Sequence, residues 1–325
     1  MRNIFNIKVP MILNDLFLNK NYTDFIKGFF MIFIVVGHII QMLIPSDILF
    51  YHQILYVLCK INIIGVGCFF FFSGYGNYLS IHKRNCLKTQ FKKCFSKIYR
   101  IYHVFFIALF FYSLMYFAFH NGNSFITYKN FLFYLLTLTI PGYTIWYLKV
   151  QVVAYIILFV SLFAKKFSTS ICLLGTIFYI LFAICLKISP LFWQTILCFP
   201  IGCFVAKYRN EIKKYLTFLT VKNTFIVLLI LISCISFCFT ATGVIFTMVL
   251  SVLGTFIVFL FSLVDIKLPN FIINLGIHSI HIYIYHWIYI SIVKYLPFNI
   301  FDKILFIFLG IMVLLIILNK KEKIE

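Results

Sequence analysis

The sequence predicts an all-α membrane protein, a polytopic helix bundle, on three observations. The chain of 325 residues is 63% hydrophobic and 11% charged, and its mean hydropathy of +1.05 lies outside the range of soluble domains. Many apolar runs reach roughly 17–21 residues, which is the length that a helix needs to cross a bilayer. Polar residues do not alternate with apolar ones, as they would in the strands of a membrane barrel. Only helices therefore fit these runs.

About ten membrane-spanning helices are expected. No linker rich in Pro, Gly or Ser divides the chain, so residues 1–325 form one domain, with residues 1–20 and 319–325 as tails. A shorter run, 131–140, is expected to be re-entrant or interfacial. The predicted spans are 27–44, 61–81, 100–119, 145–164, 170–188, 191–207, 223–240, 244–263, 275–296 and 301–318.

The net charge of +20 is explained by membrane orientation. With ten spans and a cytosolic N-terminus, 22 of the 28 Lys and Arg residues fall on the cytosolic side. This asymmetry is the positive-inside pattern, and it places both termini in the cytosol. Nucleic acid is not needed as a partner, because the basic loops carry no attached domain that could contact bases. The five basic residues expected on the opposite side are Lys60, Lys129, Lys187, Lys294 and Lys303.

Histidine is the only acid–base chemistry that the sequence places deep in the membrane. None of the eight carboxylates lies deep in a predicted span, which argues against a carboxylate proton relay and against a paired-carboxylate hydrolase. The ten cysteines include no CxxC pair and fall mostly inside spans, so no metal site is predicted. Gly-x-Ser-x-Gly, HExxH and Walker motifs are absent as well.

Two histidines are the main candidates for this chemistry. Lys27 and His38 are eleven residues apart, or three turns plus roughly 20°, so they share a face of the first span about 16 Å apart. Ser279, Tyr283 and His286 share a face of the ninth span, and His286 lies about as deep as His38. An ionisable group at this depth is a functional hypothesis, and the pKa of histidine suits proton transfer. The two imidazoles are therefore expected to face each other.

A basic stripe marks the entrance of the third span. Lys93, Lys97 and Arg100 are spaced by four and three residues, so they lie on one helix face. An orientation signal explains most of these charges. A phosphorylated cofactor would need the same arrangement, because Lys and Arg pair with phosphate oxygens.

Two further stretches allow a structural and a functional interpretation. Ser73 and Gly74 belong to a group of small residues that permit close approach of either a neighbouring helix or a ligand. Trp146 is an ordinary interfacial anchor, and Lys149 either extends outward to the interface or lines an acceptor pocket on the side opposite the cytosol.

Motifs along nearly the whole chain resemble the acyltransferase 3 family of integral membrane acyltransferases. Each motif is weak alone, but their order and spacing with about ten spans make a fairly specific signal. They are Asp24-x-x-Lys27-Gly28, Val35-Val36-Gly37-His38, Phe71-Phe72-Ser73-Gly74-Tyr75, Lys97-x-x-Arg100-Ile101-Tyr102, Trp146-Tyr147-Leu148, and Leu275-Gly276 followed by Ser279, Tyr283 and His286.

The resemblance implies a multi-pass O-acyltransferase of the bacterial cytoplasmic membrane, transferring groups other than aminoacyl groups. Such an enzyme takes an acyl group, commonly acetyl from cytosolic acetyl-CoA as co-substrate, and places it on a hydroxyl of a cell-surface polysaccharide or its precursor, without a metal. His38 would act as general base or be transiently acylated. The residues that the resemblance assigns are His38, His286 and Tyr283 for catalysis, Lys27, Lys97, Arg100, Ser73 and Gly74 for acetyl-CoA, and Asp24, Trp146 and Lys149 for the acceptor.

Lys27 departs from the family, because it stands where the family often has arginine. The lysine keeps the charge but removes a bidentate fork.

Two other functions are compatible with the sequence. A transporter or flippase for a lipid-linked sugar also suits ten spans with a polar interior. Histidines on separate helices are also compatible with haem ligation in an electron carrier.

Overall fold

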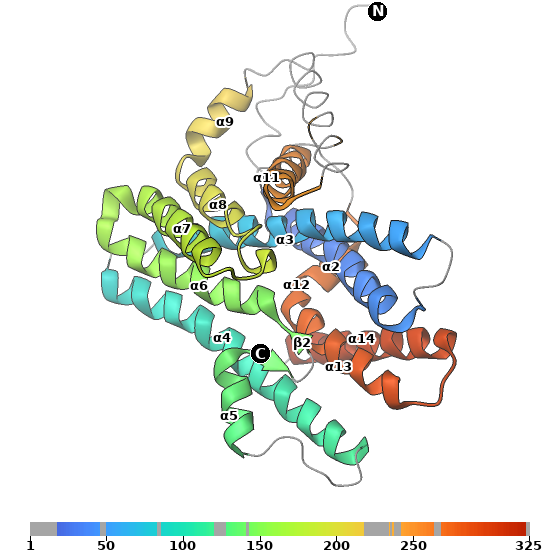
Figure 1. The fold of residues 1–325 in the computed structure, drawn as a ribbon. Coiled ribbons are helices and arrows are strands. Elements are labelled where there is room, and N and C mark those ends of the chain that lie inside the picture. Colours follow the sequence, from blue (N-terminus) through green and yellow to red (C-terminus); the bar gives the residue numbers. More distant parts are fainter. Residues whose placement is uncertain are drawn as a thin grey trace, which may run out of the picture.

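The computed structural model describes a bundle of helices with a single small strand pair. The described residues are 18–45, 50–82, 86–119, 128–140, 143–217, 234, 236, 242–262 and 268–322. In them β1 (Thr139–Ile140) pairs antiparallel with β2 (Tyr143–Thr144) (Figure 1). Seven helices of this part are long and apolar enough to cross a membrane. They are α2 (Lys20–Leu43), α3 (Tyr51–His82), α4 (Leu87–Phe119), α6 (Trp146–Ser161) continued by the following 3₁₀ turn to Lys165, α7 (Ser168–Cys185), α11 (Val244–Phe261) and α14 (Ile300–Glu322).

Two predicted spans are not single helices. The predicted span 191–207 is a short 3₁₀ turn, η2 (Pro190–Phe192), followed by further turns and α8 (Cys198–Lys207). The predicted span 275–296 is divided at His278 between α12 and α13. The predicted span 223–240 lies outside the described residues except at positions 234 and 236. The shorter elements are α5 (Tyr128–Thr137), η1 (Leu162–Phe167), α9 (Arg209–Thr217), α12 (Asn270–Ile277) and α13 (Ser279–Tyr295).

Pro200 explains where α8 begins. Pro200 lies in the first turn of α8, two residues after the start of the helix at Cys198. Proline is tolerated there because the N–H that it lacks would have no partner inside the helix. The turns before it are closed by short bonds, such as that from the Phe199 N–H to the Ile196 carbonyl at 2.9 Å.

Several helices begin earlier than predicted, including α3, which begins at Tyr51. Asn19 caps α2, because its side-chain oxygen accepts a hydrogen bond from the Tyr22 N–H at 2.7 Å, and the helix therefore includes the residues before the predicted span. α4 begins at Leu87, so Lys93 and Lys97 lie on the helix and not in a loop before it.

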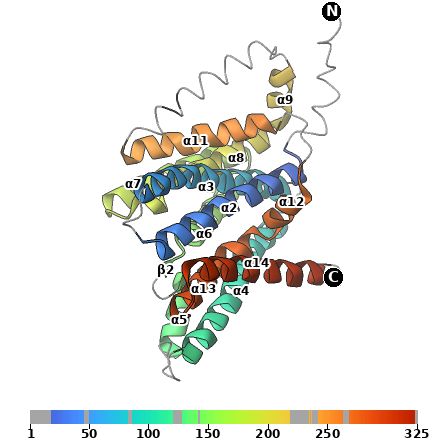
Figure 2. The same ribbon diagram turned by 90° about the vertical axis from the view of Figure 1, so that its right-hand side faces the viewer.

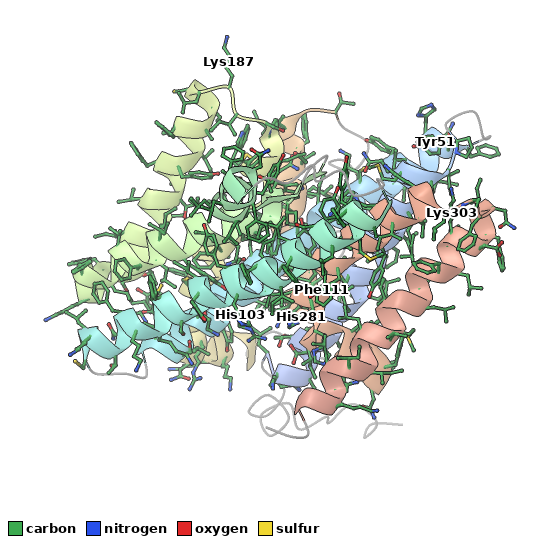
Figure 3. All side chains as sticks on the ribbon, turned by 90° about the horizontal axis from the view of Figure 1, so that it is seen from below. Tyr51, His103, Phe111, Lys187, His281 and Lys303 are labelled. Carbon is green, nitrogen blue, oxygen red and sulfur yellow. The ribbon has the colours of Figure 1, made fainter. Side chains whose placement is uncertain are left out.

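The outer faces of the helices are apolar. Large hydrophobic side chains project outward around the bundle, and Lys187 extends away from its end (Figure 3). In water such a surface would promote association, whereas lipid chains accommodate it. Examples are Phe110, Phe117, Phe178, Leu181, Val313 and Ile317. The expected membrane bundle is thus confirmed in its helical, apolar character.

Helices α2 and α12 approach each other through glycine. A Cβ at Gly28 would collide with the Ile272 carbonyl oxygen, and a Cβ at Gly276 would collide with the Asp24 carbonyl oxygen. The two backbones therefore touch directly. Figure 2 shows α12 beside the first turns of α2, with the start of α2 and the end of α14 toward the same side of the molecule.

Helices α3 and α8 make the same kind of contact. A Cβ at Gly74 would collide with the Phe199 carbonyl oxygen, and one at Gly202 would collide with the Phe71 carbonyl oxygen. The small residues of α3 were expected to allow close approach of either a neighbouring helix or a ligand. For Gly74 the structure shows the neighbouring helix.

We expect Gly74→Ala to lower the stability of the purified protein by about 1–3 kcal/mol, because the added methyl forces α3 and α8 apart. The matched control is Gly76→Ala on the same helix, where a Cβ meets open space. Gly76→Ala should gain roughly 0.5–1 kcal/mol from helix propensity. Thermal unfolding in detergent measures both variants, and equal stability of the two would contradict this packing.

Candidate active site

A cavity of about 390 Å³ lies among α2, α3, α4, α6, α12 and α13. Its rim is basic: Lys27 comes from α2, and Lys93, Lys97 and Arg100 come from α4. No carboxylate is among the described residues that line it. Four cations in one concave surface create a positive potential that attracts polyanions.

Lys27 is held in place by Asp24. Its Nζ donates to the Asp24 carboxylate at 3.0 Å, and the Asp24 side chain is 7% exposed against 29% for Lys27. Asp24 itself does not line the cavity. The pair lies in the segment of α2 that contacts α12, so the cation is positioned by the same contact that joins these helices.

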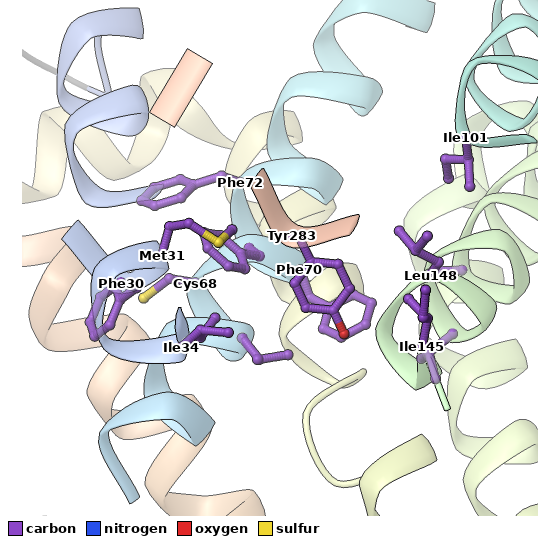
Figure 4. Packing of buried hydrophobic residues seen from close by; sticks show 14 of the residues in the cluster. Phe30, Met31, Ile34, Cys68, Phe70, Phe72, Ile101, Ile145, Leu148 and Tyr283 are labelled. Carbon is purple, nitrogen blue, oxygen red and sulfur yellow. The ribbon is translucent and has the colours of Figure 1, made fainter. Parts of the chain in front are cut away.

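Two tyrosines form the floor of the cavity. The rings of Tyr147 on α6 and Tyr283 on α13 lie 5.2 Å apart at 68°. Figure 4 shows Tyr283 between Met31 on one side and Leu148 and Ile145 on the other. The floor is therefore aromatic, with phenolic groups facing a buried environment.

The histidine pair lies beyond this floor. The His286 ring is 5.8 Å from the Tyr283 ring, and the His38 and His286 rings stack 5.3 Å apart at 20°. Trp287 packs against His38 at 4.3 Å. Neither histidine is among the residues lining the cavity, so one tyrosine ring separates the cavity from the imidazoles.

Hydrogen bonding fixes the state of His286. Its Nδ1 lies 3.0 Å from the Ile282 carbonyl oxygen. A carbonyl oxygen only accepts, so Nδ1 carries the proton, and Nε2 of the neutral ring presents a lone pair. Nε2 is fully buried and has no partner among the described residues, and the same is true of Nδ1 of His38. One ring nitrogen of each histidine is therefore buried without a hydrogen-bond partner among the described residues.

A comparison with protein-family models identifies the family of the chain. A family model described as an acyltransferase domain matches residues 20–319. The chain belongs to the acyltransferase 3 family. Neither the search of curated proteins nor that of solved structures finds a match. The protein is therefore a membrane acyltransferase, which moves an acyl group from a donor to an acceptor hydroxyl.

The cavity brings together most of the residues expected to contact the donor of this acyltransferase. Ser73, Lys27, Lys97 and Arg100 all line it, although they come from three helices. Tyr283 contributes to its floor. The expected meeting of His38 with His286 is also found, at the stacking distance given above.

Other expected site residues lie elsewhere. Gly74 packs against α8 and not in the cavity, and Asp24 bonds to Lys27 at the rim. Lys149 donates to the Thr139 hydroxyl at 3.0 Å, and neither Lys149 nor Trp146 lines the cavity. The roles of Asp24, Trp146 and Lys149 toward an acceptor stay predictions.

Sequence reasoning assigned no role to the polar wall of the cavity. Asn77, Gln151 and Tyr155 line it together with Ser73. The spacing of four residues from Tyr147 to Gln151 to Tyr155 was available as a signal, because it places all three on one helix face. In the described part of the chain, no cluster of three His, Cys, Asp or Glu residues suits a metal ion.

The Asp24–Lys27 pair should be asymmetric in its effect on stability. Lys27→Met leaves a buried carboxylate without its partner, and we expect a loss of about 3–5 kcal/mol. Asp24→Asn leaves a cation that solvent in the cavity can screen, and we expect a loss of about 1 kcal/mol.

The double variant Lys27→Met/Asp24→Asn serves as the control for this pair. It should recover most of the stability lost by Lys27→Met, because it removes the unpaired charge. Thermal unfolding in detergent measures all three, and equal losses from the two single variants would show that the carboxylate is not buried.

Proposed function

We propose that this acyltransferase transfers acetyl from cytosolic acetyl-CoA to a hydroxyl of a cell-surface polysaccharide or its precursor, in the cytoplasmic membrane of a bacterium. One observation carries the proposal: a cavity with four cations at its rim ends one tyrosine ring away from a buried histidine pair. A polyanionic donor suits the rim, and proton transfer suits the pair.

The rim supports a donor that carries several phosphates. Arg100 offers a planar fork that can bind a phosphate with two parallel hydrogen bonds, and Lys27, Lys93 and Lys97 add point charges. The positive-inside distribution of Lys and Arg puts this rim on the cytosolic side, where acetyl-CoA is available. The pantetheine arm of the donor is then directed inward toward the tyrosines.

The acceptor is proposed to come from the opposite side. Trp146 and Lys149 lie in the first turn of α6, at the same end as Tyr147 and away from the rim. An acceptor sugar there would approach His38 from the face of the membrane where surface polysaccharides are assembled.

The transfer step uses the histidines as acid and base. An imidazole nitrogen takes the proton of the acceptor hydroxyl, whose oxygen attacks the thioester carbonyl. The C–O bond forms, the C–S bond breaks, and the proton passes to the departing sulfur to give free CoA. The Tyr283 hydroxyl and His286 orient His38 or stabilise the oxyanion. In the covalent variant of this route, His38 carries the acetyl group first and then passes it to the hydroxyl.

Radiolabelled acetyl-CoA tests the proposal in vesicles that contain the purified protein and an acceptor glycan. The expected result is release of free CoA thiol together with label on the glycan. Mass analysis of surface glycans from a deletion strain then identifies the acceptor by the loss of acetyl. Movement of a lipid-linked sugar across the vesicle without any thiol release would instead support the transporter.

His38→Ala should lower turnover by about 10²–10⁴-fold, because positioned proton transfer contributes that factor. Membrane insertion and the melting temperature should change little. The control is His103→Ala, which removes an exposed imidazole from α4 and should keep full activity. A His38→Ala protein with normal turnover would remove His38 from the mechanism.

A further inference from the structure

The wall of the cavity contains a polar network between α3 and α6. The Ser73 hydroxyl accepts hydrogen bonds from the Gln151 Nε2 at 2.9 Å and the Asn77 Nδ2 at 3.1 Å. The hydroxyls of Ser73 and Tyr155 lie 3.1 Å apart. Asn77 also donates to the Ser73 carbonyl oxygen at 2.7 Å. With both of its lone pairs taken by the two amides, the Ser73 hydroxyl donates its own proton to the Tyr155 oxygen and so uses its full capacity for hydrogen bonds.

One atom of this network is left over. The Oε1 of Gln151 is buried and has no hydrogen-bond partner among the described residues, and Gln151 as a whole is 3% exposed. Buried amide oxygens are normally bonded, because an unpaired one loses the hydrogen bonds that water would give. Gln151 lines the cavity, and its other polar atom is used by Ser73. The Oε1 atom therefore keeps an unused capacity to accept a hydrogen bond, on a residue that lines the cavity.

The position of Gln151 limits which donor group it can meet. Tyr147, Gln151 and Tyr155 follow one another at four-residue intervals on α6, and all three line the cavity. Each interval rises about 6 Å along the helix. Tyr147 is at the floor, and the Tyr155 carbonyl oxygen contacts the Cys94 thiol at 3.4 Å, next to Lys93 of the rim. Gln151 is therefore about one helical turn from the floor, between the rim and the histidines.

In a thioester of phosphopantetheine, the N–H closest to the sulfur belongs to an amide two carbons away from it. With the phosphates at the rim and the thioester at the floor, this amide comes level with Gln151. A hydrogen bond to the free Oε1 would leave the bond from Gln151 Nε2 to Ser73 in place, because the two use different atoms of the amide.

We propose that the Gln151 Oε1 accepts a hydrogen bond from this N–H, so that Gln151 selects phosphopantetheine thioesters and positions the acyl carbon. The inference rests on the proposed function of the cavity as the donor site. It adds a residue that recognises where the first amide lies relative to the sulfur. The cationic rim binds only the phosphates and cannot make this distinction.

The test compares acetyl-CoA with an analogue in which oxygen replaces this single N–H. Both molecules carry the same phosphates and the same thioester. We expect the wild-type protein to use acetyl-CoA about tenfold better in kcat/KM, the factor expected for one buried hydrogen bond. In Gln151→Met the ratio should fall to about one, because neither donor is then bonded.

Two further variants separate this role from a structural one. Gln151→Glu keeps an acceptor oxygen and should keep a preference for the N–H. Arg100→Gln should weaken use of both CoA donors while keeping their ratio, and it should not change the use of S-acetyl-N-acetylcysteamine, which has the amide but no phosphate. A general loss of folded protein would lower the rate with all donors by the same factor, and the ratio of kcat/KM between acetyl-CoA and its oxygen analogue would stay the same.

The outcomes distinguish the two proposals. If the wild-type protein releases no thiol from acetyl-CoA, the proposed donor is wrong. If it uses both CoA donors equally well, or if Gln151→Met keeps the tenfold ratio, Gln151 does not bind the amide, although the proposed function still holds. The comparison of the two CoA donors with the wild-type protein can therefore disprove the inference by itself, even if a variant fails to fold.

Discussion

The direct backbone contact of α2 with α12 is the constraint on which the site depends. Glycines at positions 28 and 276 let the two helices touch, because a Cβ at either position would collide with the backbone of the facing helix. This contact holds the Asp24–Lys27 pair at the rim and brings α13, which continues from α12, alongside α2. The stacking of His38 on His286 follows from it, because both lie deeper along the same two neighbouring segments.

The site separates the cations at the rim from the buried histidine pair. Cations gather at the rim, where water and counterions lower the cost of their burial. The imidazoles lie in a dry region behind aromatic rings, where a neutral histidine with a free lone pair is stable and no charge has to be buried. Between the two lies a wall of amides and hydroxyls, which is where the polar arm of the proposed donor would extend.

Helical periodicity accounts for much of what could be predicted about the site. The equal depth of His38 and His286 follows from helix geometry and the predicted span limits, and the two rings do stack in the structure. The same periodicity does not say which helix faces which. Gly74 therefore seemed equally suited to a ligand, and its contact with α8 appeared only in the folded bundle. Gln151 was missed for the same reason, because its partner Ser73 is on another helix.

The sequence by itself determined that the chain is an apolar helix bundle of the acyltransferase 3 family with a buried pair of histidines. These properties follow from hydropathy, spacing and motif order, which are local along the chain. The tertiary structure alone decided that the predicted ninth span divides at His278, that the basic residues of α2 and α4 share one cavity, and that Gln151 faces into it. Such features depend on contacts between distant segments, and no local pattern encodes which segments become neighbours.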